Sequence, residues 1–173
     1  NFTHNLIGAV VAAVVMLVLG FLLSAVGGYL VGLVGGSNQP VSGLTLSALI
    51  LAALLMVAFG VTGLAGVGAV LGVSAVVCCA ICVSGSLIQD LKVGHLLGGT
   101  PKKMEIAEII ATITTSFVLV FPMLWLHQAN IKAGGIGIGD RELSAPQAGL
   151  MAQLAQGIVG GQMPWGLILL GMF

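Results

Sequence analysis

The chain has 173 residues, of which 58% are hydrophobic and 6% are charged, and its formal net charge is zero. All ten charged residues lie within 90–142, so the stretches 1–89 and 143–173 carry no formal charge. A soluble domain carries roughly 25% charged residues and needs them to hydrate its surface. The composition therefore excludes a soluble globule, a polar disordered chain and a basic nucleic-acid-binding domain. It indicates an integral membrane protein.

The first apolar segment, residues 6–33, is long enough to cross a bilayer. A spanning helix needs ~20 apolar residues, because the hydrocarbon core is ~30 Å thick. Small residues recur along this segment at every fourth position: Gly20, Ser24, Gly28, Gly32 and Gly36. Such a stripe lets another helix backbone approach closely, so it predicts packing within a helix bundle.

The second segment, residues 34–43, has the sequence VGGSNQPVSG and interrupts the helix. Pro40 removes a backbone donor and the glycines permit unusual dihedral angles. The side-chain amides of Asn38 and Gln39 and nearby backbone carbonyls are then left without helical partners. Two interpretations remain open. The segment is either a broken helix lining a wet cavity, as in transporters, or a loop outside the membrane.

Apolar sequence resumes after this segment and continues to Val83. One helix over residues 45–83 would be almost 60 Å long by its rise per residue, roughly twice the bilayer core. A break is therefore expected, and the glycines of 60–66 predict its place. The result is a short apolar segment over 45–60 and a full span over 64–83.

The segment 84–103 carries the first charges of the chain. Half of its first part is apolar, which predicts a short helix or a re-entrant segment. Asp90 has three interpretations: a proton acceptor, a partner for Lys92, or a solvated residue. The lysines of this segment mildly favour the cytoplasmic side.

Pro101 predicts the first turn of the next helix, with Thr100 as its N-cap and an end near residue 126. A polar stripe on this helix faces a bundle interior or an aqueous path, although its carboxylates also suit the positive helix end. The stripe consists of Glu105, Glu108, Thr112, Thr115 and Ser116.

A hydrophilic loop over 128–142 follows, then a mildly amphipathic segment over 143–158, a break over 157–164 and a last apolar run from Trp165. The sequence thus predicts an all-α integral membrane protein. We expect a polytopic helix bundle with about four full spans and additional broken or re-entrant segments.

Three cysteines, Cys78, Cys79 and Cys82, lie together in an apolar run. They cannot form a spread disulfide framework, and no His or carboxylate lies nearby in sequence to complete a metal site. Ordinary helix packing explains them. No phosphate-binding glycine loop, HExxH or GxSxG motif is present, so we predict no cofactor, no metal and no enzymatic activity.

Three motifs in order resemble the oligopeptide transporter family. Gly36–Thr45 (GSNQPVSGLT) is similar to the family's SNxPxSGxT, and Ser84–Lys102 is similar to SGDLxQDLKTGxLxGATPR. LSAPQAGLM over 143–151, with MPWG over 163–166, is similar to LPAPQAxLM and LPWG. Together the motifs extend over about 20–173, and the compact bacterial members and the yellow-stripe-like branch match best.

Two positions depart from the pattern, because Ser86 stands where the family usually has Asp and Val93 where it usually has Thr. Family members are several times longer than this chain. The resemblance therefore implies that residues 1–173 form one transmembrane transporter domain that is part of a longer protein.

The resemblance implies a proton-coupled symporter for oligopeptides or metal-chelate complexes, working by alternating access in the bacterial inner membrane. Its partners would be the substrate, protons and the lipid bilayer, with a homo-oligomer as an allowed assembly. The substrate-binding hypothesis names Ser37, Asn38, Gln39, Pro40, Ser42 and Gly43. The hypothesis for proton coupling or gating names Asp90, Lys92, His95 and Glu108. A glycine-packed channel or pore and a non-transporting membrane scaffold subunit are the alternatives.

Overall fold

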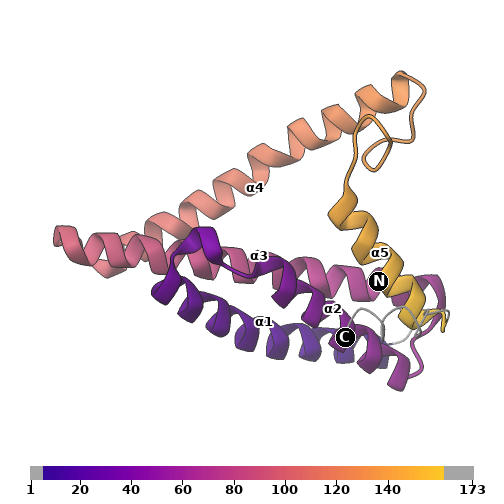
Figure 1. Ribbon diagram of the computed structural model, residues 1–173, viewed down its shortest axis with the longest axis horizontal. Coiled ribbons are helices and arrows are strands. Elements are labelled where there is room, and N and C mark those ends of the chain that lie inside the picture. Colours follow the sequence, from indigo (N-terminus) through magenta and orange to yellow (C-terminus); the bar gives the residue numbers. More distant parts are fainter. Residues whose placement is uncertain (1–5, 162–173) are drawn as a thin grey trace. The chain divides into compact units, whose positions relative to one another are not determined.

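The computed structural model describes residues 6–161, and the regular structure within that range is entirely helical (Figure 1). The elements are α1 (Leu6–Val34), the 3₁₀ turn η1 (Gly36–Asn38), α2 (Val41–Ala58), α3 (Gly63–Leu97), α4 (Pro101–Lys132) and α5 (Pro146–Val159). The predicted all-α architecture is confirmed.

Four segments are long and apolar enough to cross a membrane: Gly8–Val34, Val41–Ala58, Gly63–Leu97 and Pro101–Lys132. This confirms the predicted number of spans and the integral membrane character of the chain. The segment over 45–60, which the sequence predicts to be short, is α2, which begins directly after Pro40 and with 18 residues is itself long enough to cross a membrane. The apolar run from Trp165 lies outside the described residues.

The break between α2 and α3 falls where the glycines predict it. Gly60 and Gly63 have φ angles of +75° and +77°, in the left-handed region that glycine adopts without a steric penalty. Gly66, one turn into α3, is buried, and a Cβ there would lie 2.6 Å from the carbonyl oxygen of Val61. The turn therefore depends on a residue without a side chain at position 66.

The expected end of the third span near Val83 is wrong, because α3 continues without interruption to Leu97. Polar side chains do not stop a helix, and the segment contains no proline before Pro101. The helix ends where Gly98 adopts a φ of +76°. The Gly99 N–H then donates to the Gly94 carbonyl at 2.6 Å, which is the C-terminal closure of a Schellman motif. The segment 84–97 is thus helical, as a continuation of α3 and not as a re-entrant segment.

Helix α4 begins at Pro101, with Thr100 at the N-cap position as predicted. The Thr100 side chain makes no capping hydrogen bond, whereas its carbonyl accepts from the N–H groups of Lys103 and Met104. The helix extends past residue 126 to Lys132 and contains Pro122 in its interior. None of its residues is buried.

The loop after α4 is held against the end of that helix. The Gly137 N–H donates to Asn130 Oδ1 at 2.8 Å, and the Ile138 N–H donates to His127 Nδ1 at 3.1 Å. Gly137 is buried with a φ of +94°, and a Cβ at this position would overlap the His127 ring. The connection predicted as a hydrophilic loop therefore has a defined conformation built on two side chains of α4.

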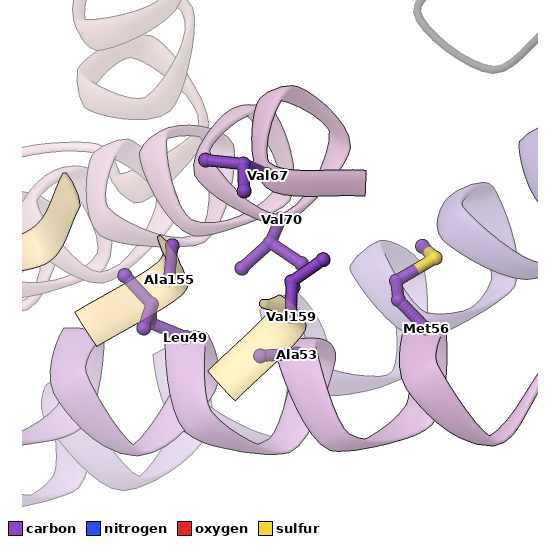
Figure 2. Packing of buried hydrophobic residues seen from close by; sticks show 7 residues of the cluster. All are labelled: Leu49, Ala53, Met56, Val67, Val70, Ala155 and Val159. Carbon is purple, nitrogen blue, oxygen red and sulfur yellow. The ribbon is translucent and has the colours of Figure 1, made fainter. Parts of the chain in front are cut away.

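The helices belong to two compact units, whose boundaries lie within α3 and within α5. The first unit comprises residues up to Ser86 and those from Met151, and the second is Leu87–Leu150. In the first unit, α2 contributes to two apolar clusters. One joins Leu49, Ala53 and Met56 of α2 to Val67 and Val70 of α3 and to Ala155 and Val159 of α5 (Figure 2). The other joins Ala48 and Ala52 of α2 to Val15 of α1 and to Val73, Val77 and Ile81 of α3. Small alanines on α2 allow these helices to pack closely.

Candidate functional site

The polar segment between α1 and α2 contacts α3 within the first unit. Gln39 Nε2 donates a hydrogen bond of 2.8 Å to the carbonyl oxygen of Ile81, which lies 42 residues further along the chain. Ser84 Oγ lies 2.9 Å from the same carbonyl and 3.0 Å from the carbonyl oxygen of Ser24 on α1. The segment that carries SNQP and the helix that carries SGS are therefore joined through polar groups.

Two buried glycines make room for the Gln39 side chain. A Cβ at Gly85 of α3 would overlap the Gln39 amide. A Cβ at Gly27 of α1 would lie 3.1 Å from Ile81 Cγ2 and 3.4 Å from Gln39 Nε2. The amide thus contacts both helices at positions where neither has a side chain. We call this hydrogen bond, together with the packing of Gln39 against Gly27 and Gly85, the Gln39 anchor.

The other predicted substrate-binding residues differ from Gln39 in exposure. Gln39 is half-buried, whereas Ser37, Asn38, Pro40, Ser42 and Gly43 are exposed. The backbone of this segment is more satisfied than the sequence predicts, because the carbonyls of Gly35 and Gly36 accept hydrogen bonds within the 3₁₀ turn. The Pro40 carbonyl accepts from the Leu44 N–H and so begins α2.

The second unit contains a pocket of about 350 Å³ between the end of α3 and the start of α4. Its lining residues are Asp90, Val93, Gly94 and Leu97 of α3 and Met104, Ala107, Glu108 and Ala111 of α4. Gly94 is buried, and a Cβ there would overlap the end of the Met104 side chain. The absence of a side chain at Gly94 therefore leaves the space that the Met104 side chain occupies, beside the turn that joins the two helices.

The pocket brings together Asp90 and Glu108, which are 18 positions apart in the sequence and lie on different helices. Their carboxylates are the only ionisable groups among the lining residues, which are otherwise apolar or small. Asp90, Lys92 and His95 are all exposed, but of these three only Asp90 lines the pocket. The helical repeat explains this difference, since positions 90, 94 and 97 share a face that 92 and 95 do not.

One hydroxyl of the polar stripe on α4 is bonded within the helix itself, because Ser116 Oγ donates to the Thr112 carbonyl at 2.7 Å. Thr114, which lies outside the stripe, likewise donates to the Ile110 carbonyl at 2.8 Å. Such bonds to the preceding turn are the usual way in which hydroxyl side chains are accommodated in apolar helices. Glu105 is exposed, whereas Glu108 is half-buried at the pocket.

The cysteines of α3 are free thiols, with Cys78 half-buried and Cys79 and Cys82 exposed. Within residues 6–161, no group of three or more His, Cys, Asp or Glu side chains is placed to hold a metal ion.

Two contacts were missed by sequence reasoning. Ile81 acts through its backbone carbonyl, which leaves no trace in the residue type. Met104 follows the predicted N-terminal turn of α4. Ala107, Glu108 and Ala111 come three, four and seven positions after it. This spacing could have indicated a common face, but the facing residues of α3 depend on the turn between the helices.

A family model described as OPT oligopeptide transporter protein matches residues 3–173. The chain belongs to the oligopeptide transporter family. A protein of Haemophilus influenzae whose name places it among the oligopeptide transporters is 32% identical over 176 residues. That similarity covers 94% of this chain and 28% of the relative, so the chain spans less than a third of that relative's length. No solved structure matches the chain. The family that the three motifs predict is confirmed.

Proposed function

We propose that this oligopeptide transporter family chain is part of a secondary active transporter that moves small peptides across the bacterial inner membrane with protons. Family membership over residues 3–173 and four apolar helices support transport through a helix bundle. The Haemophilus influenzae relative is named for oligopeptides, which favours peptides over metal chelates as the substrate class. Its bacterial source favours the inner membrane.

The observation that carries proton coupling is the shared pocket of Asp90 and Glu108. Proton relays in pumps and transporters use carboxyl groups that face a cavity inside the helix bundle. Here Asp90 and Glu108 come from two consecutive helices and line one pocket of about 350 Å³, with Asp90 exposed and Glu108 half-buried. A change in the packing of α3 against α4 would alter the surroundings of both groups together. Such a change could couple protonation to alternating access.

The substrate contacts proposed for the segment over 37–43 are neutral hydrogen-bonding groups. Ser37, Asn38 and Ser42 are exposed, and the segment carries no charge. Peptide backbones offer N–H donors and carbonyl acceptors, which amide and hydroxyl side chains match. Pro40 and Gly43 would shape the segment, since proline fixes its own φ and glycine leaves space beside the backbone.

The test is uptake of a labelled tripeptide by the full-length transporter in proteoliposomes with an imposed pH gradient. We expect Asp90→Asn and Glu108→Gln to abolish the accumulation of peptide against its own concentration gradient, while exchange of peptide across the membrane persists. Glu105→Gln is the matched control, because Glu105 is an exposed carboxylate on the same helix that does not line the pocket. It should accumulate peptide normally.

Accumulation by both pocket variants at the native level would overturn the proton-coupling assignment. Peptide flux that rises linearly with concentration and never saturates would instead indicate a channel or pore. A full-length protein that carries no peptide at all would point to the scaffold alternative.

A further inference from the structure

The Gln39 side chain differs from its neighbours in the polar segment. Ser37, Asn38 and Pro40 are exposed, whereas Gln39 is half-buried and its amide donates to α3. The Ile81 carbonyl that accepts this bond belongs to a fully buried residue of the apolar cluster between α1, α2 and α3. An amide that lost its hydrogen-bond partner in apolar surroundings would cost free energy, so this bond stabilises the position of the segment.

The same carbonyl connects the segment to α1. Ser84 Oγ is within hydrogen-bonding distance of the carbonyls of Ile81 and Ser24. Three parts of the chain, namely the segment, α3 and α1, therefore meet through four polar groups at one level of the bundle. Gly85 and Gly27 leave the space at this level, since a Cβ at Gly85 would overlap the Gln39 amide and a Cβ at Gly27 would lie 3.1 Å from Ile81 Cγ2.

We propose that Gln39 is a positioning residue and not a substrate ligand. The Gln39 anchor fixes the 3₁₀ turn against α1 and α3, and so sets where Asn38 and Ser42 present their polar groups. Gly85 and Gly27 are part of this function, because they provide the space that the amide occupies. The inference rests on the proposed role of the segment in peptide binding, and it divides that segment into one anchoring residue and several contacting residues.

The first test measures the anchor without transport. Asn38→Cys is introduced into a cysteine-free full-length transporter, and its labelling rate with a water-soluble maleimide is recorded in proteoliposomes. We expect Gln39→Ala and Gly85→Ala each to change that rate several-fold. Gly72→Ala is the matched control on α3, because Gly72 is exposed and an added Cβ would meet nothing within 4 Å. It should leave the rate unchanged.

The second test separates positioning from ligand binding. If Gln39 positions the segment, Gln39→Ala should raise the KM of uptake for different tripeptides by one common factor of about tenfold, as expected for one lost hydrogen bond. Gly85→Ala should do the same, and the double variant should be no worse than either single variant, because both remove one interaction. If Gly85→Ala alone does not fold, recovery of folded protein by added Gln39→Ala supports the anchor equally.

Three results would overturn the inference. They are an Asn38→Cys labelling rate unaffected by Gln39→Ala and Gly85→Ala, a KM ratio between peptides that changes in Gln39→Ala, and additive effects in the double variant. A native protein without peptide uptake, but with the expected labelling changes, would reject the proposed function and retain the anchor.

Discussion

Replacing Gly137 with alanine would test how the loop after α4 is held. Gly137 has a φ of +94°, its N–H is bonded to Asn130 Oδ1, and a Cβ there would overlap the His127 ring. The neighbouring Ile138 N–H is bonded to His127 Nδ1. Alanine at 137 should therefore strain the backbone and also displace the imidazole from its hydrogen bond.

The size of the effect follows from two contributions. A left-handed backbone costs a residue with a Cβ roughly 1–2 kcal/mol. Loss of the hydrogen bond between Ile138 and His127 costs about 1 kcal/mol more. The sum, about 2–3 kcal/mol, corresponds to a roughly 30- to 150-fold rise in the population of the opened loop.

Gly134→Ala is the matched control in the same loop. Gly134 has a φ of +92°, but an added Cβ would meet nothing within 4 Å. Gly134→Ala should therefore lose only the free energy of the left-handed backbone, which corresponds to a rise of roughly 5- to 30-fold in the population of the opened loop. The difference between the two variants isolates the contact with His127.

The assay is amide hydrogen exchange of the loop peptide in the full-length transporter, reconstituted in lipid nanodiscs. Exchange should be faster in Gly137→Ala than in Gly134→Ala, and His127→Ala added to Gly137→Ala should change it little further. Equal acceleration in both glycine variants would refute the role of the His127 contact. No acceleration in either would refute the loop geometry itself.

Two further predictions follow from single hydrogen bonds. His127 Nδ1 accepts the hydrogen bond from the Ile138 N–H, so His127→Ala should lower the hydrogen-exchange protection of the Ile138 amide. A protection factor that is the same in His127→Ala and in native protein would contradict this. Ser24 Oγ is buried without a hydrogen-bond partner among the described residues, whereas Ser84 Oγ bonds two carbonyls. In thermal unfolding in detergent, Ser84→Ala should therefore lower Tm while Ser24→Ala leaves it unchanged or raises it. A lower Tm in Ser24→Ala than in Ser84→Ala would contradict these hydrogen bonds.

The spans of this chain could be predicted because apolar length alone determines whether a helix can cross a bilayer. The break at Gly60 was also predictable, since glycine is the residue that adopts a positive φ freely. The true end of α3 was not, because the change from apolar to polar side chains at Ser84 indicates a change of environment and not of backbone conformation. The signal for the end was Gly98, fourteen residues later.

The site was predictable only as a set of residue types. Asp90 and Glu108 could be selected from the sequence because ionisable groups are rare in this chain, but their common pocket depends on the turn at Gly98. Gln39 could be selected as an amide without a helical partner. Its acceptor could not, because every helical residue has a carbonyl and nothing in the sequence distinguishes that of Ile81.

Pro122 in α4 has a consequence for how this helix meets lipid. A proline within a helix has no N–H to donate, so the carbonyl of Val118, one turn earlier, loses its usual partner. Pro122 follows Glu108 and Thr115 at intervals of seven residues, and the three therefore share one face over a length of about 21 Å. A carboxylate, a hydroxyl and a carbonyl without its usual helical donor are poorly solvated by acyl chains. We therefore expect this face of α4 to lie against protein or water in the bilayer and not against lipid.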